Sequence, residues 1–501
     1  LPIFKAGIDA GAMAVMTSYN MVNGEYCAQS DFVIKYLLRD QLKFKWLVMS
    51  DWWSTYDPEK VIKSGLDLEM PGHTIETSPN IKALGKPYVR ENAKKLLEEG
   101  KINEADIDRM VLNILRTAIA MNLYNQKPDK KYIEKFDEHE KVALNTAREG
   151  IVLLKNKNNI LPISNKINSI LVIGPNANII PSGLGSAKVE GYNNITLVDA
   201  LKNEFSDKIK YESFPSEEQI KNADIVILSL GTIDSEGFDR PFDLPIELEN
   251  FILHTSELNN NVILIVNSGG GIKMTNWINK ISGLIYAWYP GQIGNVAIAE
   301  VLSGKVNPSG KLPFTIEKDF NDSPGASYIP NGMTMENTWE SDLNIKLPIT
   351  KVEYKEGVLV GYRWYDTKNI KPLFPFGYGL SYTSFNYSKI QCPENMEKDD
   401  NQIEISFDIE NIGEKDGAEI AQLYIQPISS KVIRPLKELK NFVKVFLTTG
   451  QKKTVKMYLN RKDFAYWDSN IKEWKTEPGE YIIQIGSSSN DIKLNKTITI
   501  Q

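Results

Sequence analysis

The sequence is poor in the residues that build covalent cross-links and metal sites. It contains two cysteines, Cys27 and Cys392, far apart in the chain, so a disulfide framework is excluded and a bridge between them is not expected. Its three histidines, His73, His139 and His254, show none of the spacings of a zinc site. No metal centre is therefore predicted.

Long runs of one chemical character are also missing. No apolar stretch approaches the ~20 residues of a membrane-spanning helix. The 58 basic and 64 acidic residues give a net charge of -6 and form no long basic run, which argues against nucleic acid and anionic membranes as partners. The opening stretch LPIFKAGIDAGAMAV lacks the charged and apolar regions of a signal peptide. A secretory route is permitted, without being favoured, by sequons at Asn194, Asn321, Asn386 and Asn495.

What is present describes a multidomain globular protein. With 501 residues, 42% apolar and 24% charged, the chain is too long for one ordinary core. A prior of about 150 residues per domain predicts three domains.

The first segment alternates patterns typical of strands and helices, the rhythm of a parallel sheet or barrel. Strands are expected at 12–20, 46–52 and 66–72, and helices at 31–42, 58–65 and 102–124.

From about residue 146 a second α/β pattern begins. Its continuous apolar runs predict a parallel sheet covered on both faces, with strands at 167–178, 223–231, 260–271 and 281–292. The last hundred or so residues alternate with period two and predict an all-β sandwich.

Two glycine-rich segments, Ser182–Ser186 and Ser268–Gly271, invite comparison with phosphate-binding loops. Neither is followed by the Lys-Ser/Thr or the acidic ribose ligand of a nucleotide site. We interpret them as tight turns at the carboxyl edge of the second sheet, which is also where a ligand would lie.

Asp51 ends the apolar run KWLVMSD and is followed at once by two tryptophans. The carboxylate is either catalytic, with Trp52 or Trp53 as a platform for substrate, or a cap for the next helix. Asp57-Pro58-Glu59 already has the layout of a helix start, which leaves Asp51 free for other work.

Several segments together resemble glycoside hydrolase family three, in its β-glucosidase branch. The resemblance rests on MTSYNMVNG, LVMSDWW, SGLDLEMPG, EGIVLLKNKNNILPI, IGPNAN, SEGFDRPFDLP, AWYPGQIGNVAIAEVLSGKVNPSGKLPFTI and PLFPFGYGLSYTSFNYS, in order along the chain. It implies the carboxyl-terminal part of a TIM-like barrel with linker helices at 1–125, an α/β sandwich with a mainly parallel sheet at 126–380, and a fibronectin type III-like β-sandwich at 381–501.

The resemblance also implies site residues. Asp51 takes the place of the nucleophile, and Glu236 in the loop DSEGFDR takes that of the acid/base. The alternative for Glu236 is a solvated acidic loop, since Asp234, Asp239 and Asp243 lie nearby in sequence. Substrate-binding roles are implied for Tyr19, Trp52 and Ser186, and Trp52 would stack on a sugar ring. The alternative for Tyr19 is a core tyrosine, and the alternative for Ser186 is a turn serine.

The implied activity is that of a retaining, exo-acting enzyme that releases terminal β-D-glucose from β-glucosides and cello-oligosaccharides through a glycosyl-aspartate, without metal or cofactor. A β-xylosidase or arabinosidase is the alternative within the family, and a non-catalytic carbohydrate-binding protein is the alternative outside it. The family pattern places about five strand and helix units ahead of LPIFKAGIDAG. We therefore expect either that a second chain or fragment completes the barrel or that the sequence is partial, and self-association stays open. A secreted, periplasmic or lysosomal location is expected.

Overall fold

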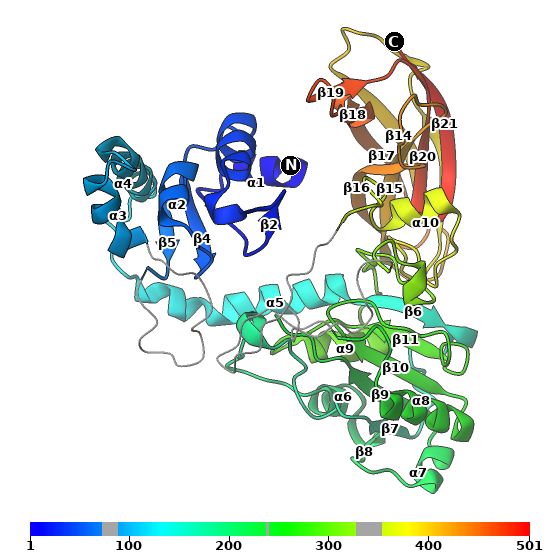
Figure 1. Cartoon of the computed structure of the whole chain (residues 1–501). Coiled ribbons are helices and arrows are strands. Elements are labelled where there is room, and N and C mark those ends of the chain that lie inside the picture. Colours follow the sequence, from blue (N-terminus) through cyan, green and yellow to red (C-terminus); the bar gives the residue numbers. More distant parts are fainter. Residues whose placement is uncertain (73–88, 237–239, 327–352) are drawn as a thin grey trace. The chain divides into compact units, whose positions relative to one another are not determined.

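The computed structural model describes residues 1–72, 89–236, 240–326 and 353–501. Contacts divide these residues into two compact units, one formed by Leu1–Ile133 and the other by the residues from Glu134 onward (Figure 1). His73 and Asp239 lie outside the described residues. Both cysteines are free thiols. No helix in the described ranges is long and apolar enough to cross a membrane.

The described part of the first unit is built on a parallel sheet with the order β1-β4-β5. The strands and helices are β1 (Ala14–Met16), β2 (Met21–Val22), β3 (Glu25–Tyr26), β4 (Leu47–Trp52), β5 (Leu68–Met70), α1 (Pro2–Asp9), the π-helix η2 (Phe32–Gln41), α2 (Pro58–Ser64), α3 (Val89–Glu98) and α4 (Glu104–Ala120). The predicted strands and helices are confirmed, with shorter bounds. The hairpin of β2 and β3 was not predicted, and the helix at 31–42 has π rather than α hydrogen bonding.

Side-chain caps explain where α2 and α4 begin. The side chain of Asp57 accepts a hydrogen bond from Lys60 N at 3.1 Å, Pro58 takes the first turn, and Gly65 ends the helix with a φ of 102°. This confirms that Asp57, not Asp51, caps α2. Asn103 and Asp106 form a capping box at the start of α4.

A buried carboxylate, Asp67, holds the first unit together. It accepts hydrogen bonds from Val48 N at 2.9 Å, Arg39 Nη2 at 2.7 Å and Asn113 Nδ2 at 2.8 Å, and Arg109 Nη1 lies 3.4 Å away. Its side chain is fully buried. The sheet, the π-helix and α4 therefore meet at one ion.

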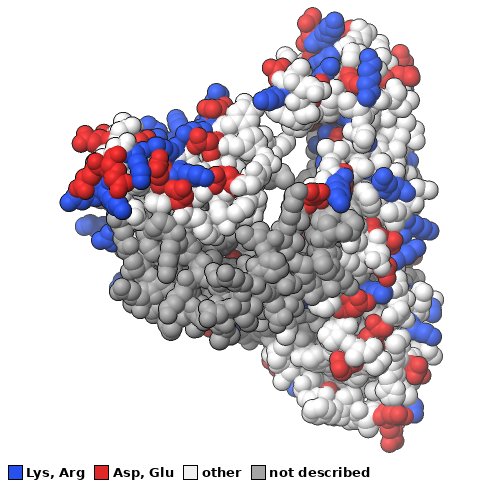
Figure 2. Space-filling view, viewed as in Figure 1, with Lys and Arg blue, Asp and Glu red and all other residues white. Residues whose placement is uncertain are grey.

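Charged side chains of both signs cover the outer helices of this unit. On the face in view in Figure 2, basic and acidic residues are interleaved over α3 and α4. On α3, Lys94 and Lys95 face Glu98 and Glu99 at 4.0 and 3.8 Å. No single-sign field builds up on this face, which agrees with the charge pattern of the sequence.

The second unit begins with a sheet of order β6-β11-β10-β9-β7-β8, in which only β6 runs antiparallel among the described strands. Its elements are α5 (Phe136–Gly150), β6 (Val152–Asn156), β7 (Ile170–Ile173), α6 (Leu197–Phe205), β8 (Ile209–Tyr211), α7 (Glu217–Asn222), β9 (Ile225–Gly231), α8 (Ile246–Leu258), β10 (Val262–Asn267), β11 (Gly283–Tyr286), α9 (Gly294–Ser303) and α10 (Tyr362–Lys368). The predicted, mainly parallel sheet is confirmed.

Two apolar clusters cover the two faces of this sheet. Ile227 points to the cluster that contains α6 and α9, whereas Val226 and Leu228 point to the cluster with Ile252 of α8. Because β9 and β10 are buried on both faces, their apolar runs are continuous.

The strand order creates a topological switch point at the carboxyl ends of β7 and β9. Strand β7 lies between β8 and β9, so the connection from β7 leads to β8 on one side and the next connection leads to β9 on the other side. Ligands of open α/β sheets bind outside such a point, where the two loops separate.

The remaining residues form the predicted β-sandwich. Its sheets have the orders β12-β14-β17 and β13-β21-β20-β15-β16. The strands are β12 (Phe385–Gln391), β13 (Asn395–Met396), β14 (Gln402–Asn411), β15 (Gly417–Pro427), β16 (Glu438–Leu447), β17 (Lys452–Asn460), β18 (Ala465–Asp468), β19 (Glu473–Thr476), β20 (Gly479–Ser488) and β21 (Asp491–Ile500). Buried and exposed residues alternate along β17, as expected for one face on the core. Short 3₁₀ turns elsewhere are η1 (Cys27–Gln29), η3 (Lys130–Lys135), η4 (Lys157–Asn159), η5 (Gly185–Ala187), η6 (Ser206–Lys208), η7 (Phe320–Asp322) and η9 (Arg461–Phe464).

Replacing Asp67 should destabilise the first unit strongly. In Asp67→Asn the amide cannot accept from all its donors, and the mostly buried guanidinium groups of Arg39 and Arg109 lose their counter-ion. We expect a loss of about 3–5 kcal/mol, measured as unfolding in urea. Glu59→Gln, which removes an exposed ion pair with Lys63, should cost less than about 1 kcal/mol. Equal effects of the two variants would contradict the role of Asp67.

Candidate functional site

Asp51 lies near the carboxyl end of β4 and is half-buried. Its Oδ1 accepts a hydrogen bond from Trp52 N at 2.6 Å. The chain then turns sharply: Trp53 has a φ of 56° and donates its N–H to Met70 O at 2.9 Å, and Ser54 Oγ donates to Asp51 O at 3.1 Å. The backbone on both sides of Asp51 is therefore fixed, and its carboxylate lies on the strand end.

Tyr19 and Trp52 lie at the same edge of the sheet. Parallel pairing places Met16 of β1 opposite Met49 of β4, so Tyr19, just past β1, and Asp51 share the carboxyl edge. Trp52 is 47% exposed, which leaves its ring open to solvent. The first unit thus places Asp51, Trp52 and Tyr19 at the same edge of its sheet, which is the edge where barrels carry their active sites.

Glu236 lies in the second unit, in the loop after β9 at the switch point. The loop after β7 runs beside it: Leu184 pairs with Ser235, and Leu184 N donates to Asp234 O at 2.9 Å. Glu236 is exposed, as is Ser186 in η5. The structure therefore brings together the loops of these two residues, which lie far apart in sequence.

Gly185 allows this close approach. Its φ is +69°, and a Cβ there would lie 3.2 Å from Ser235 Oγ and 3.4 Å from Glu236 Cβ. The sequence interpretation of Ser182–Ser186 as a turn at the carboxyl edge agrees with this position.

A pocket of about 340 Å³ opens beside Glu236. Its walls come from the loops after β7, β9 and β11, and include Pro181, Leu184, Val189 and the ring of Tyr289. A group bound here would contact apolar carbon on one side and a carboxyl group on the other.

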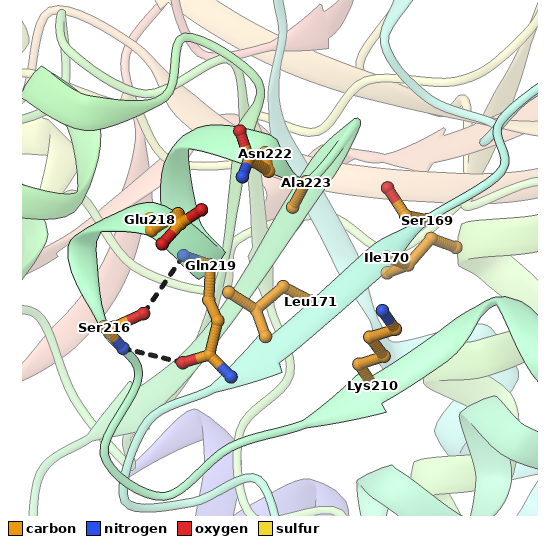
Figure 3. A pocket seen from close by; sticks show the side chains of 9 residues that line it. All are labelled: Ser169, Ile170, Leu171, Lys210, Ser216, Glu218, Gln219, Asn222 and Ala223. Carbon is orange, nitrogen blue, oxygen red and sulfur yellow. Dashed lines mark hydrogen bonds between the residues drawn. The ribbon is translucent and has the colours of Figure 1, made fainter.

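A second pocket, of about 250 Å³, lies at the opposite edge of the same sheet (Figure 3). Ser169 precedes β7, and Leu171 and Lys210 lie near the starts of β7 and β8. The dashed lines of Figure 3 are the capping box of Ser216 and Gln219 at the start of α7. Because ligands of such sheets lie at the carboxyl ends, this pocket is not our candidate site.

Two acidic residues close to Glu236 in sequence, Asp234 and Asp243, have specific ion-pair partners. Asp234, which could have been a solvated residue, is half-buried and pairs with Arg240. Asp243 lies 3.2 Å from Lys273 Nζ. Burial raises the pKa of Asp234, but hydrogen bonds from Tyr289, Gly269 N and Arg240 outweigh it, so that the pKa is lowered overall. Sequence reasoning missed these contacts.

Comparison with protein-family models assigns each part of the chain. Residues 1–117 match the glycosyl hydrolase family 3 N terminal domain, residues 151–382 match the glycosyl hydrolase family 3 C-terminal domain, and residues 419–489 match a fibronectin type III-like domain. Beta-glucosidase BoGH3A of Bacteroides ovatus is 33% identical, over 98% of this chain and 69% of the relative. The chain belongs to glycosyl hydrolase family 3. The resemblance noted in the sequence is thereby confirmed, with its partial barrel, α/β domain and sandwich.

The names of further relatives include both beta-glucosidase and arabinopyranosidase activities. Thermostable beta-glucosidase B of Acetivibrio thermocellus is 36% identical over 97% of this chain, and an exo-alpha-(1->6)-L-arabinopyranosidase of Bifidobacterium breve is 33% identical over 97%. The chain spans 63% of the length of each of these two proteins. The structure of beta-glucosidase 3B from Thermotoga neapolitana in complex with glycerol superposes with a TM-score of 0.85 at 30% identity, covering 99% of this chain and 72% of that one.

The contact of Gly185 with the Glu236 loop can be tested by one methyl group. Gly185→Ala and Gly450→Ala should each lower the free energy of unfolding by about 1 kcal/mol, because both glycines have a positive φ. No atom lies within 4 Å of a Cβ at Gly450, whereas the methyl at Gly185 presses on Ser235 and Glu236. We therefore expect only Gly185→Ala to lower kcat/KM for a chromogenic glycoside. Equal activities of the two variants would show that Glu236 does not depend on this packing.

Proposed function

We propose that this family 3 protein is a retaining, exo-acting β-glucosidase that releases terminal β-D-glucose from β-glucosides and cello-oligosaccharides. The observation that carries the proposal is the place of Asp51. It lies near the carboxyl end of the partly buried strand β4, next to the exposed ring of Trp52, and Asp57, not Asp51, caps α2. A carboxylate so placed is available for chemistry.

In this proposal Asp51 attacks the anomeric carbon, and the glycosidic bond breaks as Glu236 gives its proton to the leaving oxygen. A covalent glycosyl-aspartate results. Glu236, now a carboxylate, then takes a proton from water as the water oxygen attacks the anomeric carbon. The bond to Asp51 breaks, which frees the Asp51 carboxylate and releases glucose with retained configuration. Tyr19, Trp52 and Ser186 are proposed to contact the sugar. No step requires a metal or an organic cofactor.

The position of Glu236 supports its role as proton donor. The group that departs must lie next to the acid that protonates it. Glu236 lines the 340 Å³ pocket whose other walls include Pro181, Val189 and Tyr289. We propose that the leaving group lies against these walls.

A second candidate activity follows from the relatives named as arabinopyranosidases at 33% identity. The family resemblance implies that a tryptophan at the place of Trp52 favours a hexose over a pentose. A hydrophobic pocket discriminates against a missing methylene by only about 10–200-fold, whereas a site that hydrogen-bonds a hydroxyl group can reject an analogue without it by about 10⁴-fold or more. Comparing kcat/KM for the nitrophenyl β-D-glucoside, β-D-xyloside and α-L-arabinopyranoside separates these activities. If none of the three substrates is turned over, a carbohydrate-binding protein is favoured.

Completion of the barrel by further strand and helix units, from a second chain or fragment, also remains a proposal. Its support is the outer side of β1: Met16 is 57% exposed, and Ile3 and Phe4 of the adjacent α1 are 86% and 62% exposed. In the described residues, β1 pairs with β4 alone. An open edge with apolar neighbours invites pairing. The secreted, periplasmic or lysosomal location is likewise a prediction.

Removing the nucleophile should abolish turnover. In Asp51→Ala the covalent step is lost, and we expect kcat to fall at least about 10³-fold, with the thermal unfolding profile preserved. Asp40→Ala, an exposed carboxylate of the same unit, serves as control and should retain full activity. If Asp51→Ala keeps more than about a tenth of wild-type kcat, the assignment is wrong.

Removing the acid should produce a loss that depends on the leaving group. Glu236→Ala should lose at least about 10²-fold more kcat/KM on cellobiose than on 2,4-dinitrophenyl β-glucoside, because the activated phenolate departs without a proton. Azide should accelerate the variant by attacking the glycosyl-enzyme as an anion. Equal losses on both substrates, with no response to azide, would place the acid elsewhere.

A further inference from the structure

The Glu236 loop is bounded by a charged pair. Asp234 precedes Glu236 and Arg240 follows it, and Oδ1 of Asp234 accepts a hydrogen bond from Nε of Arg240. The side chains of Asp234 and Arg240 are only 26% and 20% exposed. Such a pair is shielded from solvent more than a surface ion pair and holds its geometry more firmly.

The second carboxylate oxygen of Asp234 ties this loop to its neighbours. Oδ2 accepts hydrogen bonds from Gly269 N at 2.7 Å, from Thr232 Oγ1 at 3.0 Å and from the hydroxyl of Tyr289. Thr232 follows β9, Gly269 follows β10 and Tyr289 follows β11. One carboxylate therefore joins the loops at the carboxyl ends of three neighbouring strands.

Arg240 anchors the far side of the Glu236 loop to the second glycine-rich turn. Its Nη2 donates to Ser268 Oγ at 3.1 Å and to Gly271 O at 3.0 Å. A Cβ at Gly269 would lie 3.2 Å from Asp234 Oδ2 and 3.3 Å from the Tyr289 ring, so glycine gives these two groups room. The segment Ser268–Gly271 thus serves to bring backbone N–H and C=O groups to Asp234 and Arg240.

Asp234 itself is unsuited to donate a proton. Both of its oxygens accept hydrogen bonds, and these lower its pKa despite burial, so it is an anion at neutral pH. Glu236 is exposed, and the Gly185 turn contacts it on one side. The hydrogen bonds of Asp234, two residues before Glu236, and of Arg240 add a second constraint on its position.

We infer that Asp234, with Arg240 and Tyr289, is the positioning residue for Glu236: its hydrogen bonds set where the acid stands relative to the leaving oxygen. The inference rests on the proposed role of Glu236. A proton donor must lie within hydrogen-bond reach of the atom that it protonates, and a shift of about 1 Å can cost about 10²-fold in rate. Loss of the Asp234 charge should therefore weaken acid catalysis while leaving Asp51 in place.

The test compares Asp234→Asn with a matched control at the other edge of the same sheet. Asp224 accepts hydrogen bonds from Asn168 N at 2.8 Å and Ser169 N at 3.1 Å, so Asp224→Asn removes a similar carboxylate far from the switch point. We expect Asp234→Asn to lose at least about tenfold more kcat/KM on cellobiose than on 2,4-dinitrophenyl β-glucoside. Asp224→Asn should lose equally on both. A loss of Asp234→Asn that is the same on both substrates would overturn the inference.

A milder variant keeps the test decisive if Asp234→Asn does not fold. Tyr289→Phe removes one of the hydrogen bonds to Asp234 and keeps the ring, and it should show the same leaving-group dependence, about threefold or more. Glu236→Ala is measured in parallel. If Glu236→Ala shows no leaving-group dependence, both the proposed role of Glu236 and this inference fail. If Glu236→Ala shows leaving-group dependence but neither Asp234→Asn nor Tyr289→Phe does, only the inference fails.

Discussion

Parallel strand pairing decides where chemistry can occur in this chain. Strands that run parallel send their carboxyl ends to one edge of a sheet, and the loops at that edge are the ones that meet. In the first unit this edge gathers Tyr19, Asp51 and Trp52. In the second it gathers Glu236 and the partners of Asp234. In the second unit, strands buried on both faces, such as β9 and β10, supply a rigid base, so that the loops at their ends can carry polar and strained residues.

Much of the fold was predictable because local patterns are strong. Continuous apolar runs indicated the parallel strands, and period-two alternation indicated the sandwich. Asp51 could be singled out because Asp57 and Pro58 form a complete helix start of their own. Glu236 is different: nothing local distinguishes it from the neighbouring acids, and only the family resemblance pointed to it.

Other features could not be predicted because their partners are distant in sequence. Asp234 accepts hydrogen bonds from residues 35 and 55 positions away in sequence, and Asp67 accepts them from residues 28 and 46 positions away. No spacing pattern reveals such contacts. The hairpin of β2 and β3 is another matter, since Asn23-Gly24, with φ values of 55° and 85°, is a recognised turn signal that could have been used. Sequence similarity does not identify the preferred sugar, because relatives at similar identity are named for glucosides and for arabinopyranosides.

The central claim is that Asp51 forms a covalent bond with the sugar, and trapping that bond tests it most directly. A 2-deoxy-2-fluoro-β-glucoside with a dinitrophenolate leaving group slows release of the intermediate more than its formation. After incubation with the enzyme and digestion, mass spectrometry should find one fluoroglucosyl adduct, on the peptide that contains Ser50, Asp51 and Trp52, with fragment ions that place it on Asp51. An adduct on another carboxylate, or turnover of β-glucosides with inverted configuration and no adduct, would contradict the account.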